Sequence, residues 1–95
     1  MDVDFSFIPD GTTRYFVKDA YNAVSSIEGA WDFLKSYTPG ANKGFMFSSD
    51  PMLDKIGAKL DEGHSGASYG YTMRQMEYIA KNGLEAYKNI WVKNE

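Results

Sequence analysis

The residues most able to do chemistry lie together in the stretch EGHSGASYGYTMRQ, from Glu62 to Gln75. It holds the one histidine of the chain, glycines that let the backbone approach a ligand closely, serines that offer hydroxyls, and an arginine near its end. A helix that starts here would direct free N–H groups and positive potential at an anion. If the chain binds a small anionic ligand or a nucleotide, we expect it here, with the contacts His64, Ser65, Gly66, Ser68, Tyr69, Arg74 and Lys43.

The same stretch does not carry a catalytic motif. The letters GHSGA approach the G-x-S-x-G elbow, but Ala67 stands where the second glycine belongs, and the elbow also needs a preceding strand and a large sheet. His64 and Ser65 are adjacent, and neighbours in a loop rarely let a base reach a hydroxyl while a third group orients the base. We therefore expect no enzyme activity and predict a tight loop that leads into the last helix.

Metal and cofactor sites are not indicated by the residue types. One histidine and no cysteine cannot supply a usual zinc ligand set, and no calcium loop of the D-x-[DN]-x-[DN]-G type is present. Asp50 and Asp54 are four residues apart, which is more typical of a helix cap and a solvated carboxylate than of a magnesium site. The letters GANKGF do not match a phosphate-binding P-loop.

Length and charge set the broad class. The 95 residues are expected to form one domain, 1–95, and the net charge of −3 argues against a nucleic-acid partner, which needs clustered Lys and Arg. No disulfide can form, and the opening MDVDFSFIPDG has acidic residues where a signal peptide is basic. No apolar run approaches the roughly 18–20 residues that span a bilayer. We therefore expect a cytoplasmic protein without a membrane partner.

Helical periodicity dominates the chain. Apolar residues recur at steps of three and four across 13–37, with Thr12 or Thr13 as the N-cap. A break near Ser25, where Ser25 and Glu28 match a capping box, is the alternative to one long helix, which we favour because the apolar stripe keeps its phase. A second long helical segment is predicted over 66–92, beginning after Ser65 or, alternatively, at Thr72, with a further break possible at Asn82–Gly83. In it, Glu77 and Lys81 are spaced for an ion pair.

Two shorter elements complete the expected fold. A helix over 51–61 is indicated by Pro51 in its first turn. The alternation in 3–8 predicts a strand, which could pair with 44–47 as a small two-stranded ribbon. The fold class is therefore mainly α, with a small α+β fold as the variant that contains the ribbon.

The surplus of aromatic residues, 16% of the chain, suggests more than core filling. We expect a small non-enzymatic binding or regulatory module that acts through protein–protein contacts, including contacts with another copy of itself. Its size and style are typical of phage or viral accessory proteins, although no motif carries that comparison. Neither the partner nor the oligomeric state follows from the sequence. The expected contact residues are Phe5, Phe7, Trp31, Tyr87 and Trp91.

Overall fold

The computed structural model describes the backbone of residues 3–38, 51–61 and 66–92, and the side chains of these residues except 61 and 66–69. This part of the chain is mainly helical, which confirms the predicted class, and it contains no strand. Its five helices are α1 (Gly11–Ser25), α2 (Ala30–Ser36), α3 (Pro51–Asp61), α4 (Gly66–Asn82) and α5 (Leu84–Val92). The helix predicted over 51–61 is thus confirmed with its bounds.

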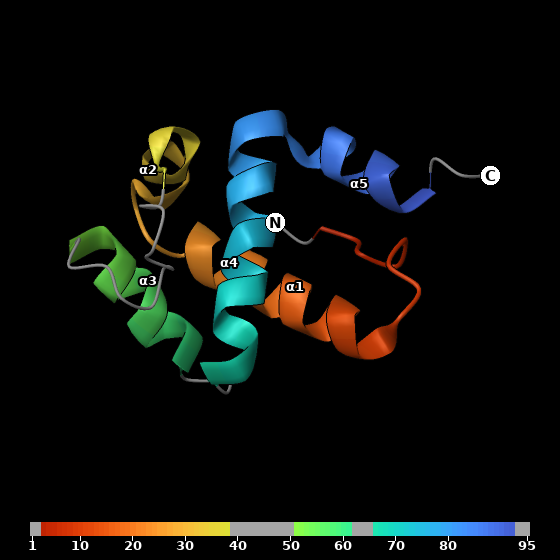
Figure 1. Ribbon diagram of the computed structural model, residues 1–95, viewed down its shortest axis with the longest axis horizontal. Helices are drawn as coiled ribbons and strands as arrows, with labels where there is room; N and C mark the ends of the chain where they lie inside the picture. The colour runs from red at the N-terminus through yellow and green to blue at the C-terminus, as the bar shows by residue number, and fades with distance from the viewer. Residues whose placement is uncertain (1–2, 39–50, 62–65, 93–95) are drawn as a thin grey trace.

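Helix α4 forms the centre of the arrangement. Figure 1 shows α4 upright, with α2 and α3 on one side, α5 on the other and α1 crossing behind it. The buried side of α4 carries Met73 and Met76, and α1 contributes Val17 and Val24 to the same core. Fully burying each such side chain contributes about 1.5–3 kcal/mol, so the packing of amphipathic faces, more than helix propensity, holds these helices together.

Helix α1 begins at Gly11, before both predicted caps, Thr12 and Thr13. Asp10 is the N-cap, and its carboxylate accepts hydrogen bonds from the backbone N–H and the hydroxyl of Thr13, at 2.8 and 2.7 Å. The Thr13 hydroxyl, followed by its backbone N–H, holds the pKa of the Asp10 carboxyl below its usual value. The prediction of Thr12 or Thr13 as the cap was wrong because the carboxylate satisfies these N-terminal donors from outside the helix.

The single helix predicted over 13–37 is wrong, and the alternative break near Ser25 is observed. Helix α1 ends at Ser25, and α2 starts at Ala30 after Gly29, whose φ of 84° lies in the left-handed region. The Ser26 hydroxyl donates to the Ala23 carbonyl at 2.7 Å, which competes with continued helix at this point. The apolar stripe keeps its phase across the turn because both helices pack against the same neighbour, α4.

The strand predicted over 3–8 is also wrong. The segment forms a turn, in which Ser6 N–H donates to the Asp4 carboxylate at 2.9 Å and Ile8 N–H donates to the Phe5 carbonyl at 3.0 Å. Phe5 and Ile8 are both buried, three residues apart, so the expected alternation of Val3, Phe5 and Phe7 does not set the buried side. The proposed partner strand, 44–47, lies outside the described residues. The ribbon is therefore not supported.

The predicted segment 66–92 consists of two helices. Helix α4 starts at Gly66, in agreement with the earlier of the two predicted starts, and Gly83, with a φ of 93°, separates it from α5. The predicted ion pair is confirmed: Lys81 Nζ lies 2.6 Å from the Glu77 carboxylate. Lys81 also donates to the Tyr37 carbonyl at 2.7 Å, which ties α4 to the residue that follows α2.

Candidate protein-binding site

The five residues expected at an interface lie in one continuous group of rings, here called the aromatic cluster. Tyr21 joins Phe5 to Trp31, with ring centroids 5.4 and 5.1 Å away, and Phe5 lies 5.8 Å from Phe7. Phe7 in turn meets Tyr87 at 6.1 Å. Tilted and edge-on pairs at such distances contribute about 0.5–1.5 kcal/mol each beyond their buried area. The cluster consists of Phe5, Phe7, Tyr21, Trp31, Tyr78, Tyr87 and Trp91.

The aromatic cluster joins the N-terminal segment 3–10 to α1, α2, α4 and α5. Phe5 and Tyr87 are only 3% and 1% exposed, so their own chain covers them in this conformation. Phe7, Trp31 and Trp91 are half-buried and still present an edge to solvent. A direct role of these five residues in a partner contact stays a prediction, and in this conformation only the three half-buried ones are within a partner's reach.

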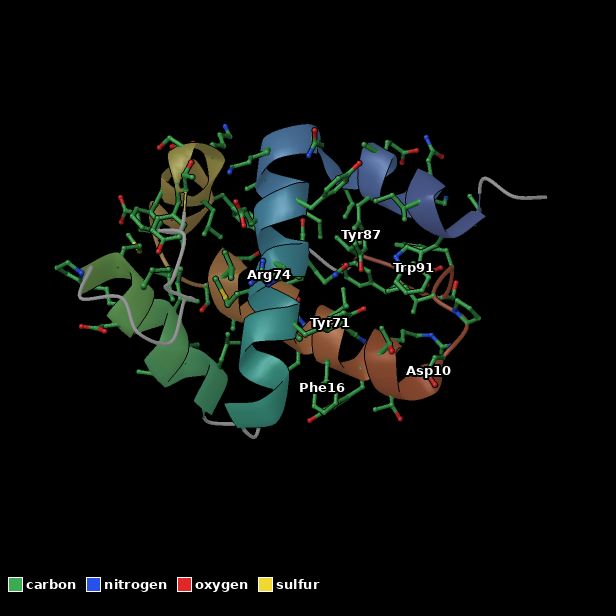
Figure 2. All side chains as sticks on the ribbon, viewed as in Figure 1. Asp10, Phe16, Tyr71, Arg74, Tyr87 and Trp91 are labelled. Atoms are coloured by element: carbon green, nitrogen blue, oxygen red, sulfur yellow. The ribbon has the colours of Figure 1, made fainter. Side chains whose placement is uncertain are left out.

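Two polar side-chain atoms are buried beneath α5. The hydroxyl of Tyr87 and the indole nitrogen of Trp91 are buried and have no hydrogen-bond partner among the described residues. Burial raises the pKa of the Tyr87 hydroxyl. The Trp91 indole N–H, which faces this hydroxyl without reaching hydrogen-bond geometry, lowers the pKa, and the Tyr71 hydroxyl raises it. The two rings lie 6.3 Å apart and project into the space between α5 and α1 (Figure 2). An unpartnered buried polar group costs about 1–3 kcal/mol, which weakens the hold on α5.

The outward side of α4 carries a second group, here called the outer face: Tyr71, Arg74 and Tyr78, of which Tyr78 also belongs to the aromatic cluster. At spacings of three and four residues these side chains stack along one side of a helix. Tyr71 is 48% exposed and Tyr78 is 37% exposed. Arg74 is exposed as well and makes no ion pair or hydrogen bond within the described part of the chain. Figure 2 shows Arg74 at the middle of α4 and Tyr71 below it, on the side of α1.

Sequence reasoning missed the outer face as a unit. Arg74 was assigned to a ligand site and Tyr78 was assigned no role. The signal was present in the spacing, since Tyr71 and Tyr78 are two turns apart and lie opposite the stripe of Met73, Met76 and Ala80. The exposure of large aromatic side chains, however, follows only from the packing of α4 against its neighbours.

The residues predicted to bind a small ligand are only partly described. His64, Ser65 and Lys43 lie outside the described residues, as do the side chains of Ser68 and Tyr69. Gly66 begins α4, so the stretch does lead into a helix N-terminus, as expected. Arg74 follows eight residues later, about 12 Å along the axis at the usual rise per residue. A ligand bound at Gly66 is therefore within reach of Arg74 only if the arginine side chain extends along α4 toward the helix N-terminus.

A shallow depression also lies on α1. Its lining comprises Tyr15, Lys18, Asp19 and Asn22, and its volume is about 180 Å³. Pockets that bury small-molecule ligands usually measure ~300–1,000 Å³. The depression is therefore too small to favour a ligand site of this kind.

Comparisons with protein-family models, with curated proteins and with solved structures find no match to this chain. Within the described ranges, His, Asp and Glu form no group of three or more placed to hold a metal ion. No helix among the described residues has the length and hydropathy required to cross a bilayer.

Proposed function

We propose that this chain is a small non-enzymatic binding module that acts through protein–protein contacts at the outer face of α4. The observation that carries the proposal is the pair of exposed tyrosines, Tyr71 and Tyr78, on either side of Arg74. Tyr and Arg are enriched among the residues that dominate binding energy in protein interfaces. Both combine a large contact area with a polar end.

The exposed positive charge of Arg74, which has no carboxylate partner in the described part of the chain, favours a protein partner. Its guanidinium is therefore available for a two-pronged contact with a carboxylate of another protein. The flanking tyrosines can shield such a contact from water and so strengthen it. We therefore expect the partner to present an acidic side chain beside an apolar surface.

Affinity capture from a lysate of the source cells tests the proposal. The wild-type chain is compared with the double variant Tyr71→Ser/Tyr78→Ser and with Tyr15→Ser, a matched control because Tyr15 is a more exposed tyrosine, at 57%, on α1. We expect one specific protein to be retained by the wild type and the control and lost by the double variant. If the wild type and both variants retain the same partner equally, the contact lies elsewhere. If none of them retains a specific partner, the proposal is contradicted.

A small anionic ligand or nucleotide at 63–70 is the second candidate. The start of α4 at Gly66, with no acidic residue in its first turn, supports it, since free N–H groups and positive potential are then unopposed locally. Titration with a nucleotide panel, followed by amide resonances, should shift Gly66, Ser68 and Arg74. An unchanged spectrum would remove this function for the compounds tested.

A further inference from the structure

The joint between α4 and α5 is a single residue. Gly83 N–H donates to the Ile79 carbonyl at 2.8 Å, and the Gly83 carbonyl accepts from Tyr87 N–H at 3.2 Å. The left-handed φ of Gly83 turns the chain between these two bonds. In a straight helix the N–H groups of 84–86 would donate to the carbonyls of 80–82. Straightening Gly83 alone would therefore add three backbone hydrogen bonds.

The apolar stripe continues through the joint without a change of phase. Met76, Ala80, Leu84, Tyr87 and Trp91 follow at steps of four, four, three and four residues. Such spacing places all five on one side of a continuous helix. The sequence of 66–92 is therefore compatible with one straight helix, and the bend at Gly83 is the feature that prevents it.

The contact between α5 and the rest of the chain is small, and it leaves two buried polar atoms without hydrogen-bond partners in the described structure. Among the described helices α5 packs mainly on α4, and the N-terminal segment contributes Phe7 beneath Tyr87. This contact encloses the two polar atoms without partners, on Tyr87 and Trp91. Their cost lowers the free energy needed to lift α5 from the aromatic cluster.

We propose that α5 is an exchangeable element, which lifts about Gly83 and inserts into the aromatic cluster of a second copy of this chain. In the dimer, α4 and α5 form one helix over 66–92, and Tyr87 of each chain packs on Phe7 of the other. A second copy is the occupant that fits because it offers the identical surface that α5 leaves, and such exchange is a low-cost route to a dimer. The inference goes beyond the proposed function, because it concerns contacts with a second copy of this chain. Of the outer-face residues it involves Tyr78, whose ring lies 6.3 Å from that of Tyr87.

Gly83→Ala is the variant that should favour the exchanged dimer. A Cβ at residue 83 meets no atom within 4 Å, so the substitution introduces no clash. Alanine disfavours the left-handed bend and favours continuous helix. Together these two preferences shift the equilibrium from the bent to the straight joint by about thirty-fold at each joint. With two joints per dimer, we expect the dimerisation constant to rise about a thousand-fold, measured by light scattering over a concentration series.

Gly29→Ala is the matched control. Gly29 has a similar φ of 84°, and a Cβ there would make only an ordinary contact with Met52, at 3.8 Å. The α1–α2 joint has its own hydrogen bonds, including Ile27 N–H to Val24 and Ala30 N–H to Ile27, and is not expected to open. We expect Gly29→Ala to lose stability and stay monomeric. If both variants dimerise equally, the dimer results from general destabilisation, and the proposed exchange is overturned.

The exchange itself is read from a dimer of one isotope-labelled and one unlabelled chain. An NOE between Phe7 of one chain and Tyr87 of the other supports the proposal. A dimer in which this contact is only intramolecular, or a monomeric Gly83→Ala, overturns it and leaves the outer-face proposal standing. If Gly83→Ala does not fold, the wild-type chain refolded at high concentration gives the same readout, and the absence of the intermolecular NOE there also overturns the exchange.

Discussion

Two glycine joints in the described part of the chain bend helices by the same left-handed backbone conformation, and they differ in what surrounds them. Gly29 and Gly83 have φ values of 84° and 93°. At the α1–α2 joint, the Trp31 indole N–H donates to the Ser25 hydroxyl at 3.0 Å, and Ser26 donates to the Ala23 carbonyl. At the α4–α5 joint, the Trp91 indole N–H and the Tyr87 hydroxyl are buried without partners in the described structure.

The difference shows that a left-handed glycine fixes a turn but not how firmly the next helix is held. Helix α2 packs against α1, α3 and α4, and its turn satisfies its own polar groups. Helix α5 packs mainly on α4 and leaves polar groups unsatisfied. We therefore expect α2 to be part of the cooperative core and α5 to open separately.

Replacing the buried side chain that anchors α2 or α5 with alanine should produce the largest change in stability. Leu34 in α2 is 0% exposed and Tyr87 in α5 is 1% exposed. Leu34→Ala should lower the free energy of unfolding by about 2–5 kcal/mol in one transition, because of the cavity it leaves. Tyr87→Ala should release α5 first, at lower denaturant than the rest, as followed by residue-specific NMR. Loss of all signals together in Tyr87→Ala would contradict the difference between the joints.

Removal of one indole N–H from each joint is a milder test. Trp31→Phe deletes a hydrogen bond and shortens the ring; loss of the hydrogen bond alone should lower the free energy of unfolding by about 0.5–1.5 kcal/mol. Trp91→Phe makes the same chemical change but removes an unpartnered donor, so it should cost less than Trp31→Phe or increase stability. Denaturant titrations of both variants measure the comparison, and a larger loss for Trp91→Phe would show that its N–H is satisfied.

The smallest effect concerns the cap of α1, which supports the N-terminal segment beside α5. The pKa of Asp10 is lowered in the folded chain, so its contribution is present above the unfolded pKa of about 4 and is lost as the pH falls through the folded value. Asp10→Asn keeps a capping oxygen without the titration. The stability of Asp10→Asn relative to wild type should therefore improve as the pH falls from 5 through the folded pKa of Asp10. Thermal unfolding measured across that range follows the change. A difference that does not change with pH would contradict this role.

The sequence indicated the helices well because apolar spacing reports directly which side of a helix is buried. It failed where short-range polar contacts decide the backbone. The hydrogen bond from Ser6 N–H to the Asp4 carboxylate holds the alternating segment 3–8 in a turn. The Ser26 hydroxyl helps to end α1 although the apolar stripe continues in phase. Neither hydrogen bond is visible in an apolar pattern.

The candidate site was predictable only in part. The residues expected at an interface did identify a physical unit, the aromatic cluster, but spacing could not show that Phe5 and Tyr87 are covered by their own chain. Burial of an aromatic ring depends on contacts between segments far apart in the sequence, such as Phe7 with Tyr87. The outer face of α4 becomes apparent only once those contacts have assigned the opposite side of the helix to the core.

Native-state hydrogen exchange tests most directly whether α5 is held more weakly than α2. The amides of α5 should exchange through a local opening of lower free energy than the amides of α2. The amide of Met76, in the middle of the buried side of α4, should exchange only on global unfolding. Equal protection of α5 and α2, both at the level of Met76, would contradict the account and leave the bend at Gly83 without a role in opening.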